Sequence, residues 1–152
     1  MNPQLQIMLQ QAIQAFQSGN FDSADLILKR VLQVDLKNLP ALHILGLINA
    51  SHSKYGEAAE YLSRAARIHP NDASIQYNLA KALSDSGNDK NALAHHKKAT
   101  ALAPNNPEAW LNYGKTATNL GDYECALNCF DKALNLKADY AEALLNKGAT
   151  LK

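Results

Sequence analysis

Residues 107–140 read PEAWLNYGKTATNLGDYECALNCFDKALNLKADY, and they hold two stretches in which small and apolar residues follow helical spacing. The first stretch has such residues at 109, 110, 113, 114 and 117, and the second at 126, 127, 130, 133 and 134. Gly121 and Asp122 separate the two. A glycine can adopt the left-handed conformation that ends a helix, and an aspartate can cap the next one. The stretch therefore predicts two short helices joined by a tight turn.

The same pattern recurs every 34 residues along the chain. Two series that stay in register are Gly46, Ala80, Gly114 and Gly148, and Ala24, Ala58, Ala92 and Ala126. They divide the chain into four gapless repeats and a truncated fifth: 5–38, 39–72, 73–106, 107–140 and 141–152. One pair of short helices cannot bury its apolar face alone, so we expect neighbouring repeats to stack. The sequence predicts a single all-α solenoid domain over residues 1–152.

Composition and charge exclude several classes of protein. The 152 residues are 47% hydrophobic, and the formal net charge of +1 is not the basic surplus typical of nucleic-acid-binding domains. No segment approaches 18 consecutive apolar residues, which argues against a membrane span. Two cysteines cannot build a disulfide framework, which favours a reducing compartment. We therefore expect a cytoplasmic protein that neither binds nucleic acid nor spans a membrane.

The repeat resembles a known family. The spacing Trp110-x-x-Tyr113-Gly114-x-x-Ala117, followed by Ala126-x-x-x-Phe130, resembles the signature of the tetratricopeptide repeat (TPR). This resemblance implies a right-handed α-solenoid of four TPR helix-turn-helix repeats plus a partial fifth. Repeat three departs from the pattern, with Gln76 where a large aromatic residue usually stands and His96 where a bulky apolar residue is normal.

The resemblance also indicates which side chains face a ligand, because the first helices of stacked TPRs line a concave groove. At the sixth repeat position the last three repeats carry Asn78, Asn112 and Asn146. An Asn amide both donates and accepts hydrogen bonds, so one Asn per repeat can pair with a peptide backbone. The series resembles the asparagine ladder of O-linked GlcNAc transferases, although Asn is also common at this position in TPRs generally.

Other groove positions differ between the two halves of the chain. The N-terminal half carries Leu9, Ile13, His43, Ile44 and Leu47, and the C-terminal half carries Tyr77, Lys81 and Lys115. An exposed apolar strip marks a binding surface or self-association, unless the terminal repeat packs these side chains against its neighbour. The two lysines favour a peptide with acidic residues.

The sequence contains no recognisable catalytic or cofactor-binding arrangement. It has no glycine-rich phosphate loop, and no Ser/His/Asp set is placed by a known scaffold. Cys125 and Cys129 are four residues apart without further ligands nearby in the sequence, which favours structural thiols over a metal site. His95 and His96 point about 100° apart on a helix and cannot chelate one ion together. We expect His96 at the edge of the core, His95 in solvent, no cofactor and no enzymatic activity.

Three hypotheses about function follow. The first is a protein–protein interaction scaffold that binds an extended peptide or helix in the concave groove. The second is a substrate-recruiting TPR arm of a larger enzyme, such as a glycosyltransferase resembling O-linked GlcNAc transferase. The Asn series supports it, as does the end of the sequence after only the first helix of a fifth repeat. The third is a scaffold that self-associates.

Overall fold

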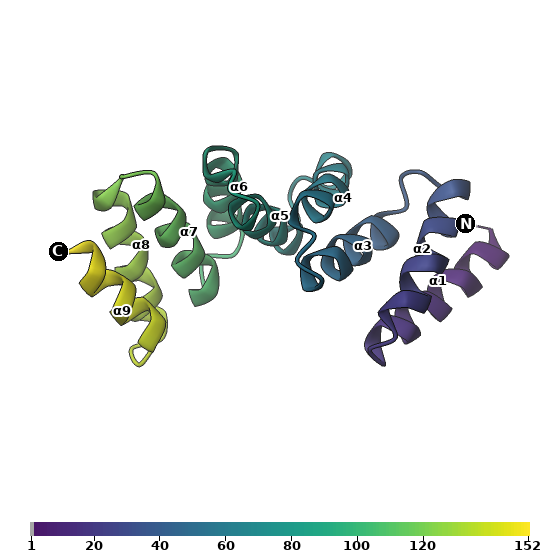
Figure 1. Ribbon diagram of the computed structural model, residues 1–152, viewed down its shortest axis with the longest axis horizontal. Helices are drawn as coiled ribbons and strands as arrows, with labels where there is room; N and C mark the ends of the chain where they lie inside the picture. The colour runs from purple at the N-terminus through teal and green to yellow at the C-terminus, as the bar shows by residue number, and fades with distance from the viewer. Residues whose placement is uncertain (1) are drawn as a thin grey trace. The chain divides into compact units, whose positions relative to one another are not determined.

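The computed structural model describes residues 2–152, which form two compact units: unit 1, residues 2–70, and unit 2, residues 71–152. Unit 1 contains α1 (Pro3–Gln17), α2 (Phe21–Val34), α3 (Leu39–Ser51) and α4 (Tyr55–Ile68). Unit 2 contains α5 (Ala73–Asp85), α6 (Asp89–Leu102), α7 (Pro107–Asn119), α8 (Tyr123–Leu136) and α9 (Ala141–Thr150), coloured teal to yellow in Figure 1. No strand occurs within residues 2–152, which confirms the predicted all-α class.

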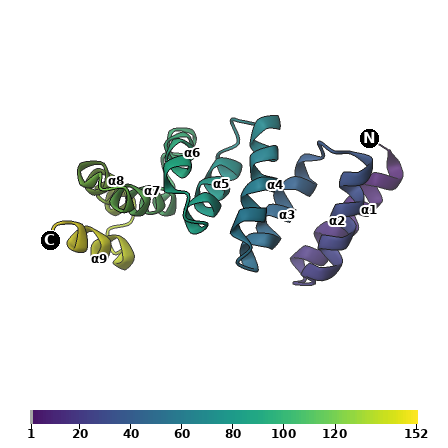
Figure 2. The same ribbon diagram turned by 45° about the horizontal axis from the view of Figure 1, so that its top comes forward.

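Within each unit the helices pair in chain order. Helices α1 and α2, and α3 and α4, pack together in unit 1, as do α5 and α6, and α7 and α8, in unit 2. Each unit also contains a contact from one pair to the next, α2 with α3 and α6 with α7, and the turned view of Figure 2 shows these antiparallel pairs. Helices α3, α5, α7 and α9 begin at residues 39, 73, 107 and 141, where the 34-residue period starts each repeat. That the repeats make one domain over residues 1–152 stays a prediction.

Capping side chains explain where the first helices begin. Asn106 precedes Pro107, and its Oδ1 accepts hydrogen bonds from the backbone N–H groups of Glu108 at 3.1 Å and Ala109 at 3.3 Å. Asp72 caps α5 in the same way. These bonds satisfy donors that have no partner inside the helix, and proline at the first turn lacks the donor altogether.

The turn between paired helices has the geometry expected from residues 121 and 122. Gly121 has a φ of 80°, and the Oδ1 of Asp122 accepts a hydrogen bond from the backbone N–H of Cys125 at 3.1 Å. Both predicted roles are confirmed. Repeat two carries Ser53 at this turn, and its φ of 60° is one that residues with a side chain adopt at a cost.

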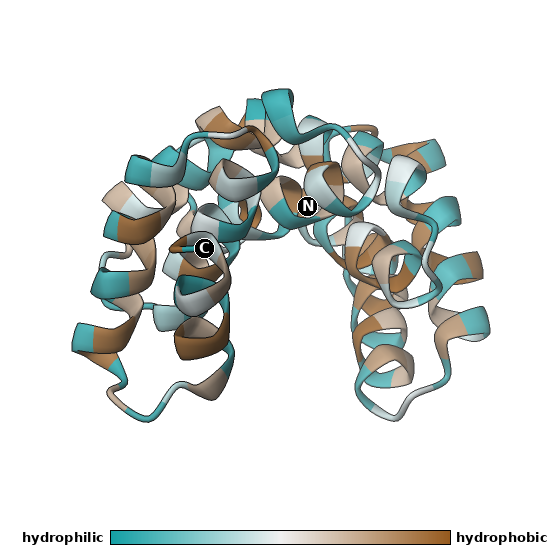
Figure 3. Ribbon diagram, turned by 60° about the vertical axis from the view of Figure 1, so that its left-hand side comes forward, coloured by the Kyte–Doolittle hydropathy of each residue, from teal (hydrophilic) through white to brown (hydrophobic). Residues whose placement is uncertain are grey.

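The core lies between the paired helices, whose sequences place hydrophobic and hydrophilic residues on the same helix (Figure 3). We expected small residues of the first helix to face alanines of the second. Instead, a Cβ added at Gly114 would stand 2.5 Å from the ring of Phe130, and one at Gly46 would stand 2.5 Å from Leu62. The expectation was wrong about the partner: the glycine makes room for the largest side chain of the second helix.

Repeat three replaces part of this apolar packing with buried polar pairs. Gln76 is 2% exposed, and its Oε1 lies 2.7 Å from the Nδ1 of His95. The expectation that His95 is solvated was therefore wrong: its ring is half-buried, because the buried amide of Gln76 needs a partner. His96 is 1% exposed and belongs to the core as predicted.

Candidate functional site

Helices α5, α7 and α9 each contribute one member of the Asn series to unit 2. Asn78, Asn112 and Asn146 are all half-buried, each held on the first helix of its repeat. A half-buried amide keeps part of its polar surface in solvent while the helix fixes its position. The three side chains therefore lie within one compact unit, with one amide per repeat.

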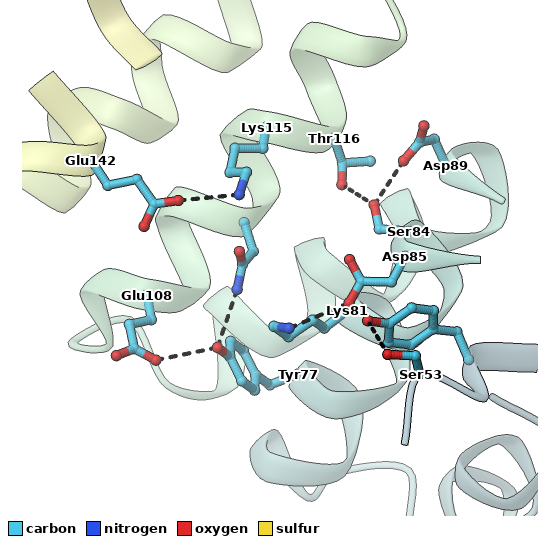
Figure 4. Close-up of polar contacts among 12 residues, drawn as sticks. Ser53, Tyr77, Lys81, Ser84, Asp85, Asp89, Glu108, Lys115, Thr116 and Glu142 are labelled. Carbon is cyan, nitrogen blue, oxygen red and sulfur yellow. Dashed lines mark hydrogen bonds and ion pairs between the residues drawn. The ribbon is translucent and has the colours of Figure 1, made fainter. Parts of the chain in front are cut away.

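Tyr77 and Glu108 surround the middle amide. The Nδ2 of Asn112 donates to the hydroxyl of Tyr77 at 3.1 Å, and this hydroxyl donates to Oε2 of Glu108 at 3.3 Å. Figure 4 shows Tyr77 on α5 pointing towards Glu108 on α7. Burial of the ring, together with the negative charge of Glu108, raises the pKa of Tyr77 to about 12. The hydroxyl therefore stays protonated and keeps both of its hydrogen bonds at neutral pH.

The two lysines of the predicted site are exposed, and each makes an ion pair. Lys115 lies 3.2 Å from Glu142 on α9, and Lys81 lies 3.3 Å from Asp85, one turn further along α5. Exposed ion pairs of this kind contribute about 0–1 kcal/mol. An incoming carboxylate can therefore replace either acidic partner at little energetic cost.

A polar cavity of about 90 Å³ opens between α5, α6 and α7. Its lining comprises Lys81, Ser84, Asp85, His96, Asn112, Lys115, Thr116 and Asn119. Three of the predicted site residues, Lys81, Asn112 and Lys115, are thus brought together around one hollow in unit 2. Tyr77 stands behind Asn112 as its hydrogen-bond partner.

A hydrogen-bonded chain connects the wall of this cavity to the N-terminus of α6. Ser84 donates to Oδ1 of Asp89 at 2.7 Å and lies 2.6 Å from the hydroxyl of Thr116 (Figure 4). Because Ser84 spends its only proton on the carboxylate, Thr116 must donate to Ser84. The hydroxyl oxygen of Thr116 then accepts from Nε2 of His96, 2.9 Å away. His96 is therefore the Nε2–H tautomer, and burial lowers its pKa to about 4.

The predicted site residues of unit 1 lie on α1 and α3. Ile13, His43, Ile44 and Leu47 are half-buried. Leu9 is only 9% exposed and belongs to the interior of the unit, so it has little surface to offer a partner. The apolar strip is thus narrower than the sequence pattern indicates.

The structure agrees with structural roles for the cysteines. Cys129 is buried between α7 and α8, and burial raises the pKa of its thiol. Within residues 2–152, no three His, Cys, Asp or Glu side chains come together in a way that could hold a metal ion. In the same part of the chain, no helix combines the length and the apolar character needed to cross a membrane.

The sequence analysis missed Glu108 and Glu142, the acidic partners of the groove residues. A spacing signal could have found them. Glu142 follows Lys115 by 27 residues, which joins the ninth position of one repeat to the second position of the next. Glu108 stands at the same second position after Lys81, and it bonds Tyr77 instead.

Comparison with known families decides the classification. One tetratricopeptide repeat model matches residues 9–73, and another matches residues 86–149. The chain belongs to the tetratricopeptide repeat family. Both matching models describe TPRs, and membership of this family supports a role as a protein-interaction scaffold. No curated protein matches the sequence.

Solved TPR structures share the fold. A crystal structure of MamA superposes with a TM-score of 0.93 at 22% identity, covering 99% of this chain and 82% of MamA. YrrB, described as a TPR protein with an unusual peptide-binding site, has a TM-score of 0.89 at 23% identity and covers 94% of this chain and 74% of its own. MamA designated AMB-1 has a TM-score of 0.82 at 26% identity, with coverages of 88% and 78%. These likenesses confirm an α-solenoid of TPRs.

Proposed function

We propose that this TPR chain is a protein-interaction scaffold that binds an extended peptide along α5, α7 and α9. The observation that carries the proposal is the placement of Asn78, Asn112 and Asn146 in one unit, with one half-buried amide per repeat. Side-chain amides that pair with a main chain bind it without reading its side chains, so recognition is broad.

The lysines give this broad recognition a preference for acidic peptides. Lys81 and Lys115 flank Asn112 around the polar cavity of unit 2. Each is exposed, and each already sits near a carboxylate of the chain. A peptide carboxylate that takes the place of Asp85 or Glu142 keeps the lysine paired, and this contribution weakens as salt is raised.

A binding experiment tests the proposal. Random twelve-residue peptides displayed on phage are selected on the immobilised protein, and the enriched peptides are synthesised and measured by calorimetry. One amide hydrogen bond contributes about 0.5–1.5 kcal/mol, so replacing Asn78, Asn112 and Asn146 by Ala is expected to weaken binding roughly ten-fold to a thousand-fold.

A matched variant controls for loss of Asn in general. Asn91, Asn128 and Asn135 lie exposed on the second helices of unit 2, and their triple replacement by Ala should leave affinity unchanged. Helicity of both variants is checked by circular dichroism. A loss of less than three-fold in the ladder variant, or an equal loss in the control, refutes the proposal.

Self-association is a second candidate, carried by the apolar strip of unit 1. Ile13, Ile44 and Leu47 remain partly exposed on α1 and α3. A second copy of the chain, or an apolar segment of a partner, removes this surface from water when it binds.

The Asn series would also serve a TPR arm that recruits substrates for an attached glycosyltransferase. The full-length reading frame discriminates this role, because a catalytic domain joined to the repeats supports it.

A further inference from the structure

The orientation of the Asn112 amide is fixed by the chemistry of its neighbours. A carboxylate oxygen only accepts hydrogen bonds, so the hydroxyl of Tyr77 spends its proton on Glu108, at 3.3 Å. The hydroxyl oxygen can then only accept from Asn112, and the group that donates to it, at 3.1 Å, must be Nδ2. Rotating the amide by 180° would place two acceptors against each other and lose this bond.

The Asn146 amide is fixed in the same sense by a different partner. Its Nδ2 donates to the main-chain carbonyl of Glu142, one turn earlier in α9, at 2.7 Å. A carbonyl oxygen has no proton to donate, so this contact also requires the nitrogen. Two successive members of the series therefore turn their nitrogen towards the protein.

The oxygens of these two amides are left for a ligand. No group within residues 2–152 donates to Oδ1 of Asn112 or of Asn146. Within the same residues, every buried side-chain oxygen and nitrogen has a partner, so these two oxygens face solvent. Each amide thus offers a ligand two acceptor lone pairs and only one remaining N–H.

We propose that Asn112 and Asn146 bind main-chain N–H groups of an extended peptide, and that Tyr77, held by Glu108, is the positioning residue that fixes Asn112 for this task. The proposal rests on the proposed function, peptide binding by unit 2, and adds its polarity. The partner is an extended segment whose N–H groups at the contact positions are unsubstituted. Proline and N-methylated residues are excluded there because they carry no such donor.

The first arm of the experiment examines the amides without a ligand. In ¹⁵N-labelled protein, the side-chain NH₂ of Asn112 should show nuclear Overhauser effects to the ring protons of Tyr77. Tyr77→Phe removes the hydroxyl alone and should shift the Asn112 NH₂ signals while leaving those of Asn146 in place. Tyr123→Phe, at an exposed tyrosine of the same unit, is the matched control and should shift neither.

The second arm measures binding of a synthetic peptide enriched in the phage selection. Each residue of this peptide is N-methylated in turn, which removes one N–H and keeps the side chain. Methylation at two or more separate positions should weaken binding about ten-fold each, and the other positions should tolerate it. Tyr77→Phe should weaken the unmodified peptide by about two- to ten-fold, and Tyr123→Phe should leave its affinity unchanged.

The outcomes separate this inference from the proposed function. A peptide whose affinity depends on the three Asn side chains, but that tolerates N-methylation everywhere, overturns the inference and leaves peptide binding standing. Asn112 signals that ignore Tyr77→Phe overturn the positioning role. If no selected peptide distinguishes the wild type from the ladder variant, the proposed function fails, and the partner assigned here fails with it.

Discussion

Adding one methyl group at Gly114 should have the opposite effect to adding it at Gly148, although the two glycines occupy the same position of successive repeats. At Gly114 the new Cβ would stand 2.5, 2.8 and 2.9 Å from three atoms of the Phe130 ring, which is 0% exposed. At Gly148 no atom lies within 4 Å of the new Cβ. The two sites share a helical backbone, so they differ mainly in packing.

The magnitudes follow from two competing terms. Replacing glycine by alanine inside a helix favours folding by up to about 1 kcal/mol at either site. Forcing a methyl group into a packed core costs about 1–3 kcal/mol, and this term applies only at Gly114. Gly148→Ala should therefore stabilise the chain slightly, and Gly114→Ala should be about 1–3 kcal/mol less stable than Gly148→Ala.

Urea unfolding measures this difference. The chain has a single tryptophan, Trp110, which lies in α7 beside Gly114, so its fluorescence reports on the affected helix. Circular dichroism at 222 nm follows all helices together. The assignment of Phe130 as the partner of Gly114 is refuted if both variants change stability in the same direction by equal amounts.

Three further predictions concern other parts of the chain. His96 has a folded pKa near 4, below its unfolded value, so unfolding takes up a proton between pH 6.5 and 4, and stability should fall by up to about 3 kcal/mol over that window. Urea unfolding at several pH values checks this: His96→Leu should flatten the profile, and an unchanged slope contradicts it, with His69→Gln at an exposed histidine as the control. Thr116→Val removes the hydroxyl that joins His96 to Ser84 and should cost about 1–3 kcal/mol in the same assay, so a neutral result argues against the chain of hydrogen bonds. Ile13→Glu with Leu47→Glu should abolish any self-association seen by light scattering while helicity is retained; dimers that survive both changes exclude this strip.

The sequence predicts the helix pairs well because their signals are local. The 34-residue period places the starts of the first helices, and the positive φ of Gly121 and the capping bond of Asp122 depend only on residues a few positions away. Glycine spacing also predicts close helix packing, since the period repeats it. The identity of the side chain opposite Gly114 depends on the tilt of two helices, which the pattern does not contain.

The polar contacts could not be predicted for the same reason. The pair of Gln76 and His95 joins residues 19 apart in different helices, and the pair of Ser84 and Thr116 joins residues 32 apart. Each residue alone indicates only a polar group at a core position. The structure shows that two departures from the repeat pattern occur together because each buried polar group requires another. The peptide-binding role of the Asn series stays a prediction.

The bond between His96 and Thr116 bears on how a chain of similar repeats finds its correct neighbours. The residues that correspond to His96 in the other repeats are Leu28, Leu62 and Phe130, none of which can form a hydrogen bond through its side chain. If repeat four stacked on any repeat other than the third, the Thr116 hydroxyl would lose His96 and face an apolar side chain, at a cost of about 1–3 kcal/mol. A misaligned array, including one that exchanges repeats with a second molecule, is therefore less stable than the native order. The polar pair acts as an address that distinguishes this interface from its apolar counterparts.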